Sequence, residues 1–437
     1  MHEIKLTDGT TTVNLNDGTS VWTTGYSLAT PAPGATDCTD SIELLFLVPT
    51  ATMRSVEAMA ERAAMRQRTR RGKRIYVTVK MTGDSETWRA ELLQGQLMSE
   101  ALIDETFIGK VRATLVLQRV PFWEGAEAEI PLVNWDMYGS DDPATGGVPV
   151  PNDPDVGCWV EIDAADVAGA IPAPVRLRIE NAEAGAQFYR YIFAANNVFS
   201  VALNASSAIQ AEDETSGLGT DSASVVYSNG FQWTTESFTT VDELLGKWAF
   251  PASLVEESAG RWWRMIARIT AYTDAHDPVL WPVLYDASGL VVLWTGPEVR
   301  PGPAGELLDF GPIPLPPGPY DSEYDTCVLG LYGRASEPTT VALDYFYLLP
   351  MDALRFVEQV AVGVDSGDWI EFDEIEGRYY AENATGRTAV HVPSEAPLIV
   401  WPGLDQRVHI LYRTTSAMTV GDEATISMWY RPRRLTL

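Results

Sequence analysis

The chain has 437 residues, of which 46% are hydrophobic and 21% charged, so it is long enough to form about two to four domains with cores of their own. Its formal charge of −29 argues against nucleic-acid binding through a broad basic face, because Lys and Arg supply the affinity for phosphates. Asp and Glu repel polyanions, which suits a surface past which DNA slides, although a salt-adapted host would also account for the acidity.

The N-terminal part of the chain reads as strands and one helix. Short alternating segments are joined by two Asp-Gly pairs typical of tight turns, and residues 41–48 form a more buried strand. A helix is predicted from Thr50 or Thr52, either of which can cap it, to a basic end at Arg74. Its expected apolar stripe consists of Val56, Met59, Ala60, Ala63 and Met65.

Three further strands follow, and the last of them, which begins at Lys110, has one apolar face and one partly polar face. Pro121 ends this strand because it removes a backbone donor, and two aromatic residues, an acid and a glycine come directly after it. Residues 1–138 are therefore predicted to form a β-sheet domain with one helix packed across it.

Residues 139–157 consist largely of Gly, Pro and Asp and are predicted to be a linker. The four aspartates in this segment could bind calcium through oxygen ligands, but they lack the EF-hand order, so a solvated hinge is the preferred interpretation. These residues are Asp141, Asp142, Asp153 and Asp155. The three cysteines, Cys38, Cys158 and Cys327, are too far apart to suggest a disulfide framework or a zinc site.

Residues 211–350 contain short aromatic strands separated by Pro-Gly turns, a pattern typical of a two-sheet sandwich or jelly roll, and residues 351–437 are again strand and turn. The chain is therefore predicted to be mainly β. It has neither the apolar segment of a signal peptide nor a run of about 18 apolar residues, so we expect no membrane span.

No residue pattern predicts catalysis. The four histidines are scattered over different segments, without metal-ligand spacing or an adjacent nucleophile, at His2, His276, His391 and His409. Carboxylates are so abundant that no glycosidase pair stands out. We therefore expect no catalytic residue, no metal site and no cofactor.

Two groups of residues are candidates for binding. Tryptophans of the aromatic segment could stack on sugar rings, although core packing is the more common role, and alternation sends Trp262 and Trp263 to opposite faces of their strand. The stacking candidates are Trp233, Trp262, Trp263, Trp281 and Trp294. The basic end of the helix could be a solvated helix terminus or a seam between subunits. The seam candidates are Arg62, Arg66, Arg70, Arg71 and Arg74.

Several segments occur in an order that resembles the tail proteins of long-tailed bacteriophages, of the distal tail or baseplate-hub type. They are "RIYVTVKMTGDSETWRAELLQGQLMS", "VRATLVLQRVPFWEG", "IPAPVRLRIENA", "APLIVWPGLDQRVHILYRTT" and "ATISMWYRPRR". The segment "TTVALDYFYLLP" resembles the closing strand of jelly-roll modules, often carbohydrate-binding, that such proteins contain.

The resemblance implies that residues 1–138 form a tail-tube-like domain whose copies assemble into a ring, expected to be a hexamer, around a channel through which DNA passes without specific binding. It also implies a β-sandwich built from 158–210 and 351–437, with the jelly roll of 211–350 inserted between them. The expected partners are other copies, the tail tube, tail-tip or hub proteins and a host-surface glycan. The protein would be made in the host cytoplasm and act in the virion, at the tail tip.

Two alternatives remain at this point. A carbohydrate-binding protein could recognise a cell surface without forming a ring, and an enzyme could degrade surface polysaccharide with a carboxylate pair in a groove.

Overall fold

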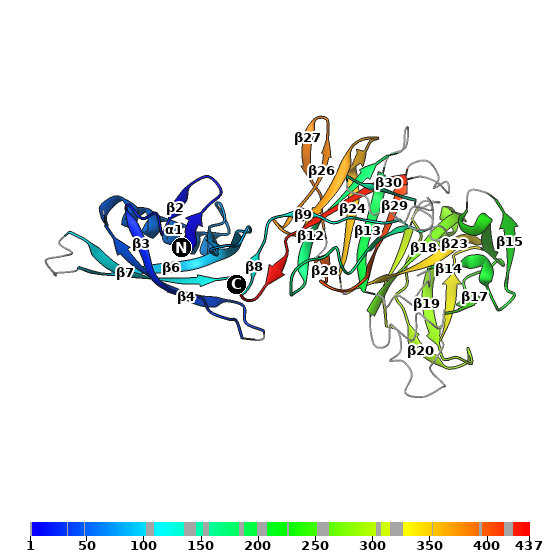
Figure 1. Ribbon diagram of the computed structural model, residues 1–437. Helices are drawn as coiled ribbons and strands as arrows, with labels where there is room; N and C mark the ends of the chain where they lie inside the picture. Colours follow the sequence, from blue (N-terminus) through cyan, green and yellow to red (C-terminus); the bar gives the residue numbers. More distant parts are fainter. Residues whose placement is uncertain are drawn as a thin grey trace. The chain divides into compact units, whose positions relative to one another are not determined.

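The computed structural model describes most of the chain, with gaps that fall mainly between strands. The described residues are 2–32, 34–47, 49–101, 109–134, 146–151, 157–182, 188–198, 208–224, 227–250, 262–302, 307–314, 327–351, 353–392, 396–414 and 423–437. They form a mainly β protein with several antiparallel sheets and one α-helix, as the sequence predicts (Figure 1). No helix among them is long and apolar enough to cross a membrane.

The chain divides into two compact units. The first unit contains Met1–Ala128, Ala168–Ala173 and Arg431–Leu437, so both ends of the chain belong to it. The second unit contains Glu129–Val167 and Pro174–Tyr430. The sequence does not predict that the last residues return to the first unit, where Arg433 and Arg434 pair with Glu124 and Trp123.

One antiparallel sheet forms the framework of the first unit. In pairing order its strands are β2 (Thr12–Asn14), β1 (Glu3–Thr7), β5 (Tyr76–Lys80), β6 (Trp88–Ala101), β7 (Val111–Arg119), β4 (Cys38–Phe46) and β3 (Val21–Ser27), with β8 (Trp123–Glu124) and β31 (Arg433–Arg434) beside them. Apolar side chains alternate along these strands, so one face of the sheet forms the core of the unit.

Helix α1 (Pro49–Thr69) covers that core with Val56, Met59 and Ala63. The helix starts at Pro49, one residue before Thr50 and three before Thr52, so neither predicted cap lies at its start. It ends five residues before Arg74, because the chain turns at Arg70, whose φ is 55°. Met65, expected in the apolar stripe, is exposed instead. The stripe is therefore narrower than the sequence predicts, and the last turn of the helix lies at the surface.

Gly95 of β6 allows α1 to approach the sheet closely. A Cβ atom at this position would lie 3.1 Å from both Ala60 Cβ and Leu117 Cδ2. We expect Gly95→Val to lower the free energy of unfolding of the first unit by about 1–3 kcal/mol through overpacking. Urea denaturation should show this loss, whereas Gln96→Val, on the opposite face, should change stability by less than about 0.5 kcal/mol. Equal effects of the two variants would contradict this packing.

The second unit contains a two-sheet sandwich built from distant parts of the chain. One sheet has the order β10 (Val148–Pro151), β30 (Glu423–Tyr430), β12 (Ala173–Asn181), β25 (Trp369–Asp373), β26 (Arg378–Asn383) and β27 (Gly386–Ala389), with β28 (Ile399–Val400) and β9 (Ala128–Glu129) beside it. The other has the order β11 (Trp159–Ile162), β29 (Gln406–Thr414), β13 (Phe188–Val198) and β24 (Leu354–Val364).

This pairing is the one that a sandwich interrupted by an insertion requires, since β12 pairs with β25 and β30 and β13 pairs with β24 and β29. Part of the expected linker at 139–157 is not a linker, because Val148–Pro151 pair with β30 as a strand. Much of the remaining segment lies outside the described residues.

Residues 208–350, which we name the aromatic module, form two facing sheets. The first has the order β15 (Gly219–Ala223), β16 (Phe231–Thr235), β23 (Val341–Pro350), β18 (Trp262–Tyr272) and β21 (Leu307–Pro314), with β14 (Ala208–Gln210) paired to β23. The second has the order β17 (Glu243–Ala249), β22 (Val328–Arg334), β19 (Val279–Tyr285) and β20 (Val292–Thr295). Short 3-10 helices lie at η2 (Ala211–Asp213), η3 (Ser228–Gly230) and η4 (Asp274–His276).

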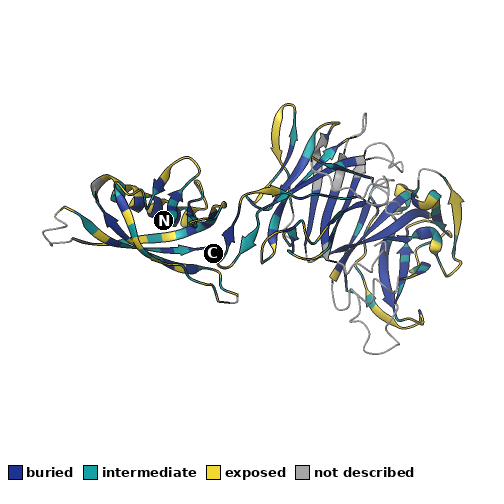
Figure 2. Cartoon of the chain, in the orientation of Figure 1, coloured by how far each residue is buried: buried dark blue, intermediate teal, exposed yellow. Residues whose placement is uncertain are grey.

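Counted along the chain from β16 to β23, the strands have the order 1-8-3-6 in one sheet and 2-7-4-5 in the other. This is the strand order of a jelly roll, which the sequence predicts for this segment. Strand β23 is buried at every position (Figure 2), because Phe346 and Leu348 pack in the module core while Tyr345 and Tyr347 pack in a cluster shared with the sandwich.

His409 lies in that shared cluster, where its Nδ1 atom is 2.6 Å from the hydroxyl of Tyr347. Burial, with Arg407 nearby, holds the pKa of His409 well below its usual value. Below about pH 6.5 the unfolded chain therefore binds a proton that the folded chain does not.

We expect the free energy of unfolding of the second unit to decrease as the pH falls below about 6.5, by up to about 1.4 kcal/mol per pH unit from His409 alone. His409→Asn should flatten this slope in denaturation series at several pH values. His391→Gln, which removes an exposed imidazole, is the control. If His409→Asn leaves the dependence of the unfolding free energy on pH unchanged, the dependence does not come from His409.

Candidate functional site

The net negative charge of the chain belongs to the second unit. The first unit has 17 Lys and Arg residues against 16 Asp and Glu, and so a formal charge of +1. The second has 14 against 44, and so a formal charge of −30. The net acidity of the whole chain therefore gives no support to a DNA channel in the first unit, because that unit carries almost no net charge.

One face of the first unit's sheet is not covered by α1. Strand register places a single set of side chains of β3, β4, β6 and β7 on this face, which we name the outer face. It includes Trp22, Thr39, Ser41, Glu43, Gln94, Gln96, Met98, Arg112, Thr114, Val116 and Gln118, all exposed or half-buried. The partly polar side of the strand that begins near Lys110 thus belongs to a surface of mainly uncharged polar groups. Figure 2 shows the strands of this unit with alternating buried and less buried positions.

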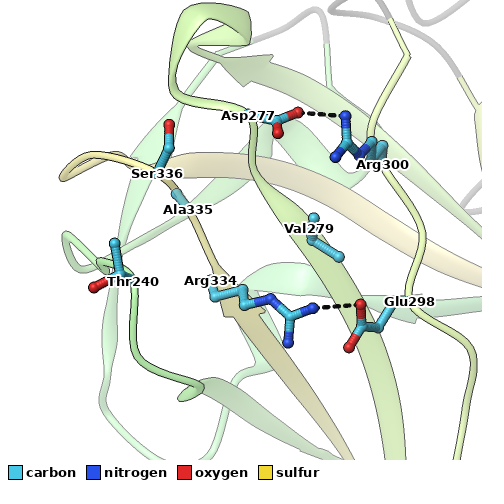
Figure 3. Close-up of a pocket in the computed structure, with 8 residues that line it drawn as sticks. All are labelled: Thr240, Asp277, Val279, Glu298, Arg300, Arg334, Ala335 and Ser336. Carbon is cyan, nitrogen blue, oxygen red and sulfur yellow. Dashed lines mark hydrogen bonds and ion pairs between the residues drawn. The ribbon is translucent and has the colours of Figure 1, made fainter.

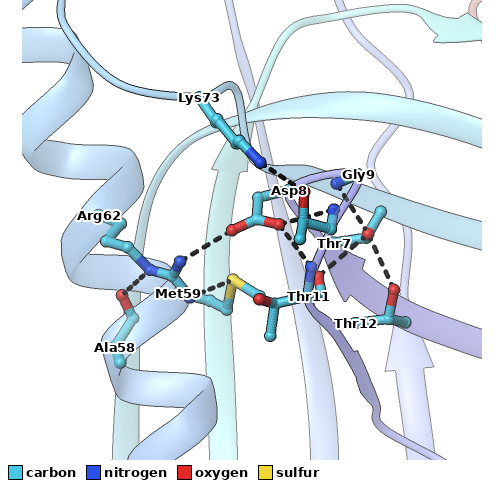
Figure 4. A network of polar contacts seen from close by, with 10 residues as sticks. Thr7, Asp8, Gly9, Thr11, Thr12, Ala58, Met59, Arg62 and Lys73 are labelled. Carbon is cyan, nitrogen blue, oxygen red and sulfur yellow. Dashed lines mark hydrogen bonds and ion pairs between the residues drawn. The ribbon is translucent and has the colours of Figure 1, made fainter.

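Some of the arginines proposed for a subunit seam are bound within their own unit. Arg62 donates from Nη1 to Asp8 Oδ2 at 2.8 Å and from Nε to the Ala58 carbonyl at 3.3 Å (Figure 4). The N–H groups of Thr11 and Thr10 keep the pKa of Asp8 below its usual value, so this carboxylate remains charged beside Arg62. Arg62 therefore fastens α1 to the β1–β2 turn.

Glu91 of β6 accounts for two more of these arginines, since it lies 3.5 Å from Arg66 Nε and 3.6 Å from Arg74 Nε. The sequence does not indicate these pairings, because Glu91 is distant along the chain. Arg70 and Arg71, with neighbouring Arg68, are exposed and form no ion pair with a described residue. Of the predicted seam residues, Arg70 and Arg71 therefore remain available to a partner, and the exposed Arg68 lies beside them.

The five tryptophans proposed for sugar stacking lie in different surroundings. Trp233 and Trp263 are 1% and 2% exposed in the module core, so they are withdrawn as stacking candidates. Trp262 is 53% exposed, which confirms that alternation sends Trp262 and Trp263 to opposite faces. Trp281 is buried under the guanidinium of Arg334, and Trp294 is half-buried against the core.

A pocket of about 370 Å³ opens on the aromatic module (Figure 3). Two ion pairs lie on its walls, Arg300 with Asp277 at 2.7 Å and Arg334 with Glu298 at 2.5 Å. Val279 and Ala335 supply apolar surface, and the hydroxyl residues Thr240 and Ser336 complete the lining. The pocket thus has hydrogen-bond donors, acceptors and an apolar patch on its walls. One of its residues, Arg334, also lies over the ring of Trp281, which stacks on Tyr332.

The four aspartates considered for calcium binding lie outside the described residues. Within the part of the chain that the structure describes, no three His, Cys, Asp or Glu side chains are grouped so that they could hold a metal ion. The four histidines remain apart, as their spacing predicts: His409 is in the shared cluster, whereas His2, His276 and His391 lie elsewhere.

No protein-family model matches the chain, and no curated protein matches it. Among solved structures, it is similar to a chain of the phage P2 baseplate in its activated conformation with Ca, at 7% identity and a TM-score of 0.29 over 100% of both chains. The same baseplate with Sr gives 7% identity and a TM-score of 0.30 over 100% of both chains. A chain of infectious bursal disease virus, Gt strain, gives 10% identity and a TM-score of 0.17 over 81% of this chain and 84% of that chain. TM-scores of this size do not establish a shared fold.

Proposed function

We propose that the protein is a structural subunit of a phage tail tip, of the distal tail or baseplate type, whose first unit assembles into a ring. The observation that supports this most is the division of charge, with +1 on the first unit and −30 on the second. Copies that meet through their second units repel one another, whereas copies that meet through their first units do not. The resemblance of the quoted sequence segments to tail proteins points to the same assembly.

The outer face suits the wall of a channel that DNA passes without binding. Affinity for duplex DNA comes mainly from Lys and Arg that neutralise phosphates, and the outer face has one arginine among its described side chains, Arg112 near the start of β7, against the carboxylate of Glu43. Gln, Thr and Ser keep the surface hydrated, and Glu43 adds a repulsive charge. The mainly uncharged polar composition of the outer face, and not the net acidity of the whole chain, therefore supports a DNA channel.

Ring closure by identical copies needs two complementary patches on each copy. For one of them we propose Arg68, Arg70 and Arg71, which lie together at the end of α1 without an ion pair to described residues. The hexameric state, and the tail tube and hub proteins as partners, belong to this proposal.

Changing Arg68, Arg70 and Arg71 to Glu should weaken association of the full chain about tenfold or more, because three cations on the seam become anions. Sedimentation velocity over a concentration series measures this directly. The matched control changes Arg300, Arg378 and Arg387 of the second unit to Glu, which alters the net charge equally. If both variants associate like the unaltered chain, the seam lies elsewhere.

The pocket on the aromatic module favours a second, peripheral function, glycan binding. Sugars offer vicinal hydroxyls that a carboxylate or guanidinium can bind bidentately, and Val279 and Ala335 give apolar surface for the C–H face of a ring. Binding on a glycan array should fall about tenfold in Glu298→Gln and be retained in Glu337→Gln, whose exposed carboxylate lies outside the pocket lining. Loss in Trp262→Ala but not in Glu298→Gln would move the site to the exposed indole.

A further inference from the structure

The aromatic module exposes four consecutive large apolar side chains where β19 turns into β20. Leu290 is 80% exposed, Val291 57%, Val292 52% and Leu293 39%. Single exposed apolar residues are common on soluble proteins, but a contiguous run of them marks a contact surface. We name residues Leu290–Thr295 the β20 edge.

This hairpin is held in one conformation by its own polar groups. The carboxylate Oδ1 of Asp286 accepts hydrogen bonds from the N–H groups of Leu290 and Val291, at 3.2 and 3.1 Å. Gly289 adopts a φ of 70°, and Lys247 donates from Nζ to its carbonyl at 2.6 Å. The apolar side chains are therefore presented on a fixed turn and strand.

The β20 edge also offers backbone groups. Strand β20 is the last in its sheet and pairs with β19, and no described strand pairs with its other side. An open edge with uncharged, apolar side chains is the arrangement to which an extended segment adds as a further strand. Natural proteins usually protect such an edge with Lys or Pro, and neither occurs between Leu290 and Thr295.

We propose that the β20 edge binds an extended segment of another protein, with alternating apolar side chains and neutral or basic flanks. Lipid is disfavoured as the occupant, because hydrocarbon cannot satisfy the open backbone edge. A second copy is disfavoured by charge, since the aromatic module has 20 Asp and Glu against 6 Lys and Arg. The same negative charge attracts a basic segment and repels an acidic one, so the module discriminates between partner segments by their charge.

The test uses the full chain and two capped heptapeptides of alternating Thr and Val, one flanked by Lys and one by Glu. Hydrogen exchange followed by mass spectrometry should show that the Lys peptide slows amide exchange at the β20 edge about tenfold, and that the Glu peptide has a much smaller effect. Replacing Leu290 and Val292 with Thr keeps strand propensity, removes the apolar surface and should abolish the protection. Replacing the exposed Val241 and Leu404 with Thr should leave it intact.

Three results would overturn the proposal. One is no protection by either peptide in the folded chain, and another is equal protection of both double variants. The third is protection of the β20 edge by phosphatidylglycerol vesicles, or by raising the concentration of the chain alone, in place of the peptide. That result would assign the surface to a membrane or to self-association.

Discussion

Replacing Asp40 with Ala is expected to lower the free energy of unfolding of the first unit by about 3–5 kcal/mol, because it leaves a buried arginine without its counter-ion. The Asp40 and Arg119 side chains are both fully buried, and Arg119 Nε donates to Asp40 Oδ2 at 2.6 Å. Arg119 also donates to the Val120 carbonyl at 2.9 Å and lies over the Trp123 ring at 4.2 Å. The pair thus fixes the end of β7, where the chain leaves the sheet.

Urea denaturation, monitored by hydrogen exchange of the amides in β4 and β7, measures this loss of stability. The control is Asp40→Leu combined with Arg119→Met, which removes both charges and should recover most of the stability, since buried ion pairs are often replaceable by apolar groups. A loss below about 1 kcal/mol in Asp40→Ala would show that Arg119 finds other partners.

Trp233→Ala should cost the aromatic module about 3–5 kcal/mol, the range for removing a buried aromatic side chain. Trp233 makes an edge-to-face contact with Trp248, with ring centroids 5.0 Å apart. Gly219 and Gly246 lie so close to its indole that a Cβ atom at either would come within 3.0 Å of it. The indole fills a site that the surrounding backbone cannot close, so truncation leaves a cavity.

Trp262→Ala is the comparison, because this neighbouring indole is exposed, and we expect a change below about 0.5 kcal/mol. Thermal or chemical denaturation of the two variants separates a core role from a surface role within the same module. Similar losses in both variants would contradict the placement of these tryptophans.

The fold class follows from the sequence because alternation and turn residues are local signals. Alternation correctly separated Trp262 from Trp263, and the stripe at Val56, Met59 and Ala63 correctly predicted the buried side of α1. The helix ends were less accurate, since the chain turns at Arg70 while the basic composition continues to Arg74.

The candidate sites could not be assembled from local patterns. The sequence offers Arg66 and Arg74 to a solvated helix end or a subunit seam, because their shared partner, Glu91, is brought near them only by the packing of α1 on the sheet. The residues that line the pocket come from four segments that are separate in the sequence, near Thr240, Asp277, Glu298 and Arg334, so no local pattern indicates the pocket. The division of net charge, by contrast, is visible in the sequence, since residues 1–138 contain 14 Lys and Arg against 18 Asp and Glu. The return of the last residues adds three arginines to the first unit, which the sequence does not predict.

Association of the full chain as a function of salt tests the central claim most directly. At about 0.05 M NaCl the acidic second units repel one another over more than 10 Å, and at about 0.5 M this repulsion is largely screened. If the first unit forms the ring, light scattering and negative-stain images should show rings with a central opening that become more populated as salt increases. A chain that stays monomeric at both salt concentrations and at high protein concentration would contradict assembly through the first unit.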